Sequence, residues 1–203
     1  MTGARIIKAL KEIFVSLKNT KLTAGLVAAI VLAIPLIVWS QSAGPQIGPS
    51  YSSDPPLGKT GAPGEGTCSG CHGGGPGGGS IGVKSSSGTT YHPGTKQHLT
   101  VTIADPNADT WGYELTAVQT KKGIVGAGKF KATDKNSDVR AANGKSYGAQ
   151  INDLSGKTGK VTYKIDWTPP KKNVGKITLY FAANAAGGAG ESEYNSSLTL
   201  SPK

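Results

Sequence analysis

Sulfur-containing side chains are scarce in this chain of 203 residues, which has two cysteines and one methionine. Two cysteines are too few for the disulfide framework of a small cystine-rich domain. The single methionine is Met1, so the rest of the chain has no methionine to offer a metal. The length allows one domain of about 150 residues with additional segments, which excludes a large multidomain enzyme.

Acidic residues are also few, with 12 Asp and Glu against 22 Lys and Arg, and the formal net charge is +10. Glycine, in contrast, is abundant at 30 residues. Because each glycine in a helix interior costs about 1 kcal/mol relative to alanine, a helical bundle is disfavoured. The excess of positive charge suits an anionic partner, and its distribution along the chain indicates which kind.

One long uncharged run, Leu22 to Ser40, has the length of about 20 residues that a membrane-spanning helix needs. Residues 1–21 carry five Lys and Arg against one Glu, a net charge of +4. The positive-inside rule therefore predicts a single-pass helix over 22–40 with a cytoplasmic N-terminus. Apolar residues at three-to-four spacing predict that 1–21 form a basic amphipathic helix on anionic inner-leaflet lipid. A cleaved signal peptide is the alternative, but its apolar core is shorter.

Residues 41–66 are rich in Gly, Pro and Ser and predict a linker. Cys68, Cys71 and His72 follow as C-x-x-C-H, a motif typical of haem c attachment. Two thiols add to the vinyl groups of one haem, and the histidine becomes the proximal iron ligand. Glycine fills 11 of the 22 positions from 61 to 82, which predicts a loop packed on other structure rather than a helix.

Three other interpretations of the motif stay open. Cys68 and Cys71 could form a disulfide in an oxidising compartment. Both cysteines with His72 and a second histidine have the ligand types of a zinc site. A thioredoxin-like redox pair would need a βαβ context, which the glycine-rich flanks do not provide.

The candidates for the sixth iron ligand are narrowed by elimination. Met1 lies on the other side of the predicted membrane helix, so a methionine ligand is excluded. The remaining histidines are His92, in a Tyr-His-Pro-Gly turn, and His98, which alternates out of phase with the apolar positions that follow it. We favour His92 over His98, and an iron bound by water, Lys or Tyr is the alternative to both. For each histidine, an ordinary exposed side chain is the simpler interpretation.

Apolar residues alternate with polar ones along most of the remaining chain, a pattern typical of strands in an antiparallel β-sandwich. We expect an all-β domain over 67–203, with Trp111 and Trp167 in its core or against the haem. The sequence predicts about seven strands, near 81–84, 99–103, 111–117, 129–132, 161–167, 177–183 and 198–200. Pro93-Gly94, Asp105-Pro106 and Asn143-Gly144 mark turns between them.

The segments GKTGAPGEGTCSGCHGG, TVTIADPNADTWGYELTAV, IDWTPP, LYFAANAAGGAG and SLTL occur in this order between residues 57 and 200. Together they resemble bacterial reelin-type (Reeler, choice-of-anchor) domains that carry a C-x-x-C-H motif. The resemblance implies an exported β-sandwich that is a monohaem c-type cytochrome, with Cys68 and Cys71 as thioether sites and His72 as the proximal ligand. It also implies structural roles for Trp111, Trp167 and an Asn184–Gly190 loop. The segment YGAQIN departs from the family, because many relatives have a histidine in the segment that matches Tyr147–Asn152, whereas this chain has Gln150 near that position and no histidine over 99–203.

These features predict a membrane-tethered monohaem cytochrome that carries electrons on the periplasmic face of a bacterial inner membrane. Residues 41–203 carry 17 Lys and Arg against 11 Asp and Glu, a net charge of +6, which predicts an acidic docking surface on the partner. Partners of this kind are an oxidase, a reductase or a photosynthetic reaction centre. No catalytic constellation is recognisable, so we expect neither enzymatic turnover nor nucleic-acid binding. The alternatives are a reelin-like adhesion or structural subunit with absent or structural haem and, less favoured, a haem sensor or peroxidase with an open iron site.

Overall fold

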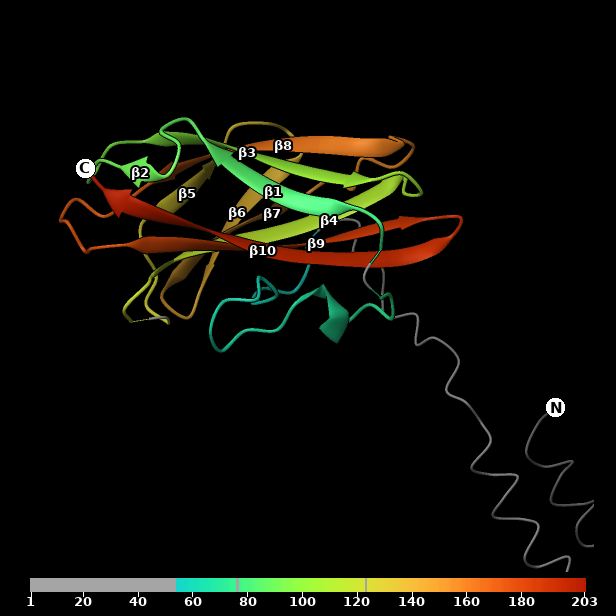
Figure 1. Ribbon diagram of the computed structural model, residues 1–203, viewed down its shortest axis with the longest axis horizontal. Helices are drawn as coiled ribbons and strands as arrows, with labels where there is room; N and C mark the ends of the chain where they lie inside the picture. The colour runs from blue at the N-terminus through green and yellow to red at the C-terminus, as the bar shows by residue number, and fades with distance from the viewer. Residues whose placement is uncertain (1–53, 76, 123) are drawn as a thin grey trace, which may run out of the picture. The chain divides into compact units, whose positions relative to one another are not determined.

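Strands form where apolar and polar side chains alternate, and they build two facing sheets (Figure 1). The computed structural model describes residues 54–75, 77–122 and 124–203. In chain order the strands are β1 (Ser80–Ser85), β2 (Thr90–Tyr91), β3 (Gln97–Asp105), β4 (Thr110–Gln119), β5 (Lys129–Ala132), β6 (Ser137–Ala142), β7 (Lys145–Gln150), β8 (Gly159–Thr168), β9 (Ile177–Gly187) and β10 (Gly190–Pro202).

The two sheets differ in their number of strands. One has four strands in the order β1-β3-β8-β5, and the other has six in the order β2-β10-β9-β4-β7-β6. Neighbouring strands are antiparallel, except that the short β2 runs parallel to β10. The predicted all-β sandwich is therefore confirmed, with one short parallel pair at the edge of the larger sheet.

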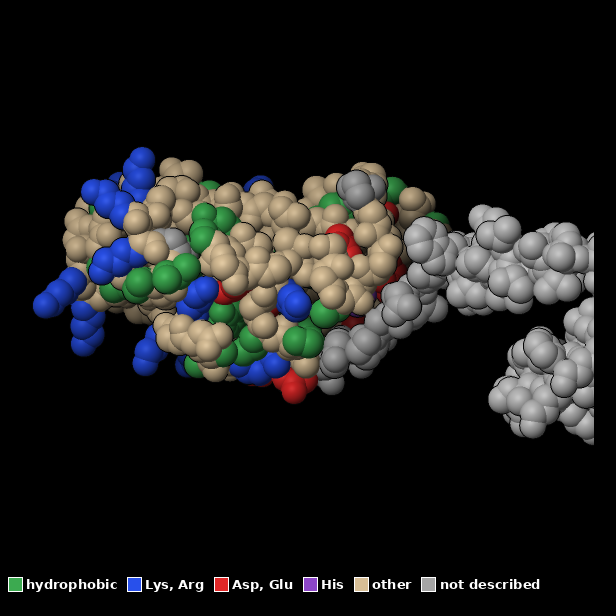
Figure 2. Space-filling model, turned by 90° about the horizontal axis from the view of Figure 1, so that it is seen from below, with side chains coloured by type: hydrophobic (Ala, Val, Ile, Leu, Met, Phe, Trp, Pro, Cys, Tyr) green, Lys and Arg blue, Asp and Glu red, His purple; other side chains and the backbone are tan. Residues whose placement is uncertain are grey.

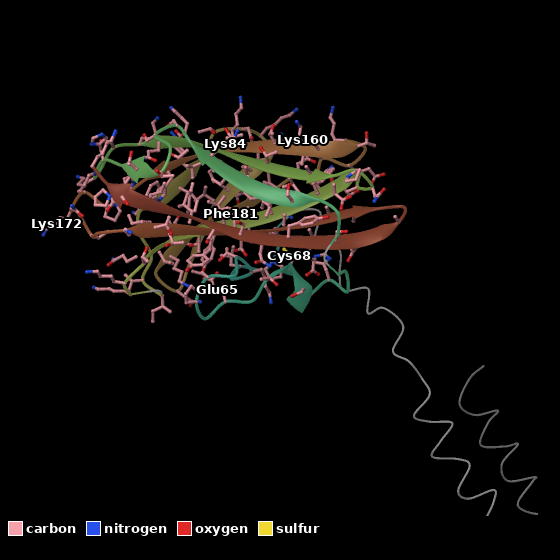
Figure 3. All side chains as sticks on the ribbon, viewed as in Figure 1. Glu65, Cys68, Lys84, Lys160, Lys172 and Phe181 are labelled. Atoms are coloured by element: carbon pink, nitrogen blue, oxygen red, sulfur yellow. The ribbon has the colours of Figure 1, made fainter. Side chains whose placement is uncertain are left out.

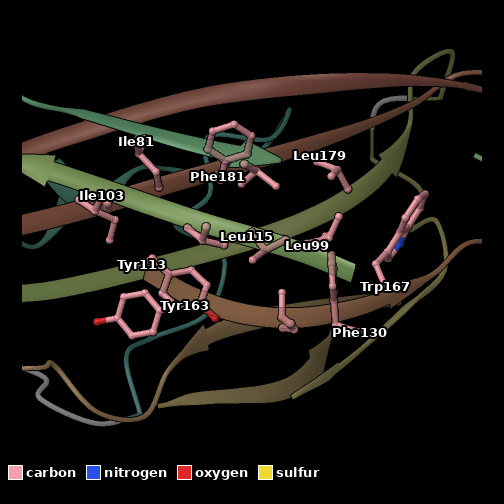
Figure 4. Packing of buried hydrophobic residues seen from close by; sticks show 14 of the residues in the cluster. Ile81, Leu99, Ile103, Tyr113, Leu115, Phe130, Tyr163, Trp167, Leu179 and Phe181 are labelled. Atoms are coloured by element: carbon pink, nitrogen blue, oxygen red, sulfur yellow. The ribbon is translucent and has the colours of Figure 1, made fainter. Parts of the chain in front are cut away.

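The core lies between the sheets and consists of the inward side chains of both (Figure 4). Leu99, Val101 and Ile103 of β3 are buried, and the polar residues between them face outward. The rings of Tyr113 and Tyr163 meet across the two sheets with centroids 4.6 Å apart. Burial of such side chains stabilises the fold by about 1.5–3 kcal/mol for each large residue.

Three strands were absent from the sequence prediction. Strands β6 and β7 form a hairpin around Asn143 and Gly144, whose φ angles of 50° and 73° suit the predicted turn. Their sequences, SDVRAA and KSYGAQ, contain few large apolar residues. One face of this hairpin is covered by polar residues, so its side chains on that face need not be apolar. The two-residue β2 and the polar first half of β10 also lack the alternating pattern.

The predicted segments before residue 54, including the basic helix over 1–21 and the membrane span over 22–40, lie outside the described residues. Within residues 54–203, other than positions 76 and 123, no helix is long and apolar enough to cross a membrane.

Residues 54–75, which we call the strap, lie on the outer face of the six-stranded sheet (Figure 3). The C-x-x-C-H motif belongs to the strap, and its Cys68–Gly70 turn is a single turn of 3-10 helix. Part of the predicted linker, residues 54–66, is thus packed against the domain.

Candidate functional site

The strap is held down by carboxylates and basic side chains of the sheet below it. Glu114 of β4 accepts hydrogen bonds from the backbone N–H groups of Gly58 at 3.0 Å and Lys59 at 2.6 Å. Arg140 of β6 pairs with Asp54 and donates from Nη2 to the carbonyl of Pro55 at 2.6 Å. These contacts join residues at least 55 positions apart in the sequence.

A second anchor is buried beneath the middle of the strap. Glu65 accepts hydrogen bonds from Lys145 Nζ at 2.5 Å, from the Tyr147 hydroxyl at 2.6 Å and from the Thr60 hydroxyl at 2.5 Å. The side chains of Glu65 and Lys145 are only 6% and 8% exposed. Burial pushes the pKa of Glu65 upward, but the hydrogen bonds from Lys145, Thr60 and Tyr147 outweigh it, so the pKa lies below its ordinary value.

The motif itself forms a tight turn. The backbone N–H groups of Cys71 and His72 both donate to the carbonyl of Cys68, each at 3.0 Å. The strap then runs flush against β10, because a Cβ atom at Gly74 would lie 2.3 Å from the carbonyl oxygen of Glu191. Gly75 forms an isolated bridge with Ser192 of β10. The expected loop against β-structure is what the structure shows.

A cavity lies between the strap and the outer face of the six-stranded sheet, with about 720 Å³ of empty space that is partly open to solvent. Its walls combine the two thiols and the imidazole of the motif with apolar and polar groups. The residues that line it are Pro55, Pro56, Lys59, Cys68, Cys71, His72, Thr110, Trp111, Gly112, Tyr113, Glu114, Gln150, Asp153, Asn184, Ala186 and Glu191.

His72 is oriented by Glu191 of β10 and lies close to Asn184 of β9. Its Nδ1 lies 3.2 Å from Glu191 Oε2 and 3.3 Å from Asn184 Nδ2. A carboxylate can only accept, so Nδ1–H donates to Glu191 and Nε2 keeps its lone pair. Histidines that ligate metals are held in this way, by a carboxylate or carbonyl that fixes the tautomer and raises the basicity of the ligating nitrogen.

The thiol of Cys68 is neutral at physiological pH. Burial, with the nearby negative charges of Glu193 and Glu114, raises its pKa to about 12. Catalytic and redox-active cysteines have lowered pKa values, because the thiolate is the nucleophile. The Cys68 environment is therefore unlike that of a thioredoxin-type pair, in agreement with the absence of a βαβ context in the described residues.

The donor set fits a covalently attached haem. Both thiols and the imidazole face one cavity, and His72 has an oriented Nδ1 with a free Nε2. Two buried oxygens beside it, Asn184 Oδ1 and Glu193 Oε1, have no hydrogen-bond partner among the described residues. Buried polar atoms are normally satisfied, so this corner of the site is suited to a further polar or coordinated group.

The other interpretations of the motif have less geometry in their favour. Both cysteines are free thiols. A zinc ion would need a further ligand near His72, and the described residues contain no cluster of three or more Cys, His, Asp or Glu side chains arranged for a metal ion.

The structure does not bring His92 or His98 to the motif. His98 lies on β3 of the four-stranded sheet, with its side chain 71% exposed on the outer face and Nδ1 2.5 Å from Asp166 Oδ1. His92 is exposed in the segment between β2 and β3. The strap covers the outer face of the opposite sheet, so a sixth ligand from His98 would require the domain to rearrange. Gln150 does line the cavity, and its Oε1 accepts a hydrogen bond from the Tyr113 N–H at 2.8 Å.

The two tryptophans belong to the core, which is one of the two positions that the sequence predicted for them. Both are fully buried, and their indole N–H groups donate to the carbonyls of Lys157 and Ala127, at 2.6 and 2.9 Å. Trp111 also borders the cavity, whereas Trp167 does not. The expected loop over Asn184–Gly190 is different: its first four residues belong to β9, and the chain turns only after Gly187.

Sequence reasoning missed the residues that orient the motif and anchor the strap. Glu65, Glu114 and Glu191 are isolated carboxyl residues in the sequence, without a motif of their own. Lys145 follows the Asn143-Gly144 turn and would be expected to be solvated, yet it is buried. A weak signal was available in Glu114, a charged residue within the alternating run that predicts β4.

No protein-family model and no curated protein matches the chain. Among solved structures, the chain is similar to the reelin-N domain of F-spondin, with a TM-score of 0.46, 17% identity, and coverage of 61% of this chain and 86% of that chain. The chain is also similar to a human F-spondin reeler domain, with a TM-score of 0.45, 16% identity, and coverage of 61% of this chain and 88% of that chain. A third similar structure is a cohesin module of a Clostridium perfringens family 33 glycoside hydrolase, with a TM-score of 0.44, 14% identity, and coverage of 62% of this chain and 96% of that chain. These are similarities among β-sandwich domains, too distant to carry function.

Proposed function

We propose that this chain is a haem c-binding β-sandwich protein that transfers electrons. The observation that carries the proposal is the convergence of Cys68, Cys71 and His72 on one cavity, with His72 Nδ1 held by Glu191. The motif and this orientation are independent of each other, since Glu191 lies 119 residues from the histidine.

Haem c, when bound, supplies a one-electron iron couple whose potential depends on ligands, burial and nearby charge. Cys68 and Cys71 would hold it through thioether bonds, and His72 would present Nε2 to the iron. Glu191 keeps the imidazole in the tautomer that leaves Nε2 unprotonated. Trp111 and Tyr113 of β4 contribute to the sheet wall of the cavity, while their rings belong to the core between the sheets.

The polar groups of the cavity favour a carrier over an enzyme. Burial raises the pKa of Glu114 to about 7, which is a value suited to acid–base catalysis. Both of its oxygens, however, accept hydrogen bonds from the strap backbone, so the residue holds the strap and has no oxygen directed to a substrate.

The predicted membrane segment gives the carrier its place. A domain tethered on the periplasmic face of a bacterial inner membrane has a high effective concentration near membrane complexes, so weak docking suffices. We therefore propose a membrane electron-transfer complex as donor or acceptor.

The test is expression of the full chain together with a haem c maturation system, followed by acid–acetone extraction and an absorption spectrum. We expect haem that stays with the polypeptide and titrates reversibly between oxidised and reduced forms. Cys68→Ala with Cys71→Ala should abolish covalent haem, and His72→Ala should alter the spectrum. His98→Ala is the matched control, because it removes an imidazole from the opposite face. Haem-free protein from a host that matures other c-type cytochromes would refute the proposal.

The β-sandwich fold by itself also suits the second candidate, a reelin-like adhesion or structural subunit in which haem is absent or structural. The two candidates differ in what His72→Ala does. A stoichiometric complex with a partner protein that survives this substitution unchanged would favour the structural subunit, whereas loss of electron transfer with intact folding favours the carrier.

A further inference from the structure

Many of the lysines on the face seen in Figure 2 lie at one end of the sandwich. The loops at this end follow β4 and β8 and precede β3, and backbone hydrogen bonds join them: Gly94 N–H donates to the Pro170 carbonyl and Thr120 N–H to the Lys176 carbonyl, both at 3.0 Å. We call this region the basic end. Its exposed lysines are Lys121, Lys122, Lys171, Lys172, Lys176 and Lys203.

None of these six lysines takes part in an ion pair within the described residues. The carboxylate of the described chain near this end, Asp166, is only 5% exposed and is already bound by Lys96 and His98. Carboxylates collect instead at the other end of the strands and beside the strap, as the register of the sheets places them: Asp105, Asp109, Asp153, Glu191 and Glu193. The two ends of the sandwich thus differ, because lysines at the other end, such as Lys157 and Lys160, lie among these carboxylates.

Apolar side chains project from the same end. Ile124 is 63% exposed and Val125 is 39% exposed, and in the sequence a single glycine separates them from the lysine pair of the β4–β5 loop. Exposed aliphatic side chains flanked by lysines suit a lipid interface, where the aliphatic groups enter the boundary below the headgroups and the lysines meet the phosphates.

We propose that the basic end docks on an anionic phospholipid surface. Three separate segments, the β4–β5 loop, the β8–β9 loop and the residue after β10, present these lysines at one end of the sandwich, and a continuous anionic plane can engage all of them at once. A protein partner with an acidic patch is the competing occupant. The exposed side chains of Ile124 and Val125 favour lipid. Their burial in the membrane boundary would add to the charge attraction and would not require a complementary pocket on a partner. The proposal does not depend on haem.

The predicted membrane helix would bring any form of the full chain to a bilayer, so simple vesicle binding cannot test docking. The full chain should instead be placed in nanodiscs of phosphatidylcholine alone or with phosphatidylglycerol, and its lysines acylated briefly with a membrane-impermeant reagent. Mass spectrometry then reports each lysine separately.

We expect phosphatidylglycerol to lower acylation of Lys121, Lys122, Lys171 and Lys172 at least about threefold. The internal controls are Lys84 and Lys160, exposed on the outer face of the four-stranded sheet and labelled in Figure 3. Their acylation should not change. The protection should disappear in high salt, since surface charge attraction is screened.

Two variants complete the test. Ile124→Ser should weaken the protection with all lysines present, whereas Ile151→Ser, which alters another exposed isoleucine outside the basic end, should leave it unchanged. Equal acylation in both nanodiscs would overturn the proposal and leave the acidic protein as the occupant. Protection of Lys84 and Lys160 to the same degree would overturn it too, because it would indicate adsorption without orientation.

Discussion

At the scale of single residues, the site depends on a few carboxylates that lie far from the motif in sequence. Glu191 fixes the tautomer of His72, while Glu65 and Glu114 hold the strap that carries both cysteines. Their effects can be separated by substitution, and those of Glu65 and Glu114 also by pH, because the pKa of Glu65 is lowered and that of Glu114 is raised.

Glu191→Gln should leave covalent haem attachment intact and raise the midpoint potential of the bound haem. Loss of the carboxylate makes His72 a weaker donor and removes a negative charge that favours the oxidised iron. Potentiometric titration measures the shift. Asp138→Asn, a carboxyl substitution on β6 away from the cavity lining, is the control and should shift the potential far less. An unchanged potential in Glu191→Gln would contradict the orientation assigned to His72.

Glu65→Gln should destabilise the strap by about 3–5 kcal/mol, because it leaves Lys145 buried without its counter-ion. Since the folded-state pKa of Glu65 lies below its ordinary value, its stabilising contribution is present at neutral pH and is lost as the pH falls below about 4.5. Limited proteolysis of the strap over pH 3–7 measures this. In Glu65→Gln the acid-dependent increase in cleavage should be absent. Lys157→Gln, which removes an exposed lysine, should behave as wild type.

Glu114 should give the opposite pH dependence. Burial raises its folded-state pKa from 4.5 to about 7, so its contribution to stability is complete below about pH 4.5 and is lost as the pH rises through about 7. The loss in the free energy of unfolding between pH 5 and 8 should be on the order of 1–3 kcal/mol. Denaturant unfolding measures it, and Glu114→Gln should have a flatter profile. A wild-type profile that rises over this range would show that the strap N–H groups outweigh burial.

At the scale of elements, the glycine run after the motif serves to bring the strap close to β10. Gly74 has no room for a Cβ atom, because the carbonyl oxygen of Glu191 would lie 2.3 Å away, whereas a Cβ atom at Gly75 would meet nothing within 4 Å. This difference between neighbours gives a test with a built-in control.

Gly74→Ala should displace the strap from β10 and with it the contact between His72 and Glu191. We expect a lower thermal midpoint, a loss of about 1–3 kcal/mol, and a shifted potential of the bound haem. Gly75→Ala should be close to neutral in both measurements. Equal effects of the two substitutions would mean that glycine serves backbone flexibility here and not close approach.

Sequence patterns predicted the central elements well and the edges of the larger sheet poorly. Strands β3, β4, β8 and β9 alternate cleanly because one face of each enters the core. Strands β6 and β7 hold the polar strap, so their outward positions carry residues such as Arg140 and Lys145. From the sequence alone, such residues are expected to be exposed to solvent. The motif was visible because its chemistry requires a fixed spacing. The carboxylates that support it contact it only through the fold, and no spacing rule connects Glu65 with Lys145.

At the scale of the whole molecule, the formal charge misrepresents the surface that surrounds the motif. The residues beyond the predicted span carry a net charge of +6, yet Glu191 and Asp153 line the cavity beside a single lysine, Lys59, and six exposed lysines lie at the basic end. A partner that exchanges electrons at the cavity therefore meets a local surface that favours cations, which differs from the acidic docking surface expected from the sequence.

Reaction of the reduced protein with small oxidants should report this local charge. The rate with a cationic oxidant should fall as salt is added, and the rate with an anionic oxidant should rise, because salt screens attraction in one case and repulsion in the other. Stopped-flow absorbance measures both. Glu191→Gln combined with Asp153→Asn should flatten the dependence, and Lys171→Gln combined with Lys172→Gln should not. Slopes of the opposite sign would mean that net charge governs approach.

The position of the motif ahead of every strand has a consequence for how the protein matures. His72 and both cysteines emerge from synthesis before the sandwich, whereas Asn184 and Glu191 belong to its last two strands. Under the proposed function, a haem-attachment machinery would meet the thiols while the chain is still open, and pairing of β9 with β10 would then bring Glu191 to the imidazole. Chain direction would thus order the maturation of the domain, with modification before enclosure.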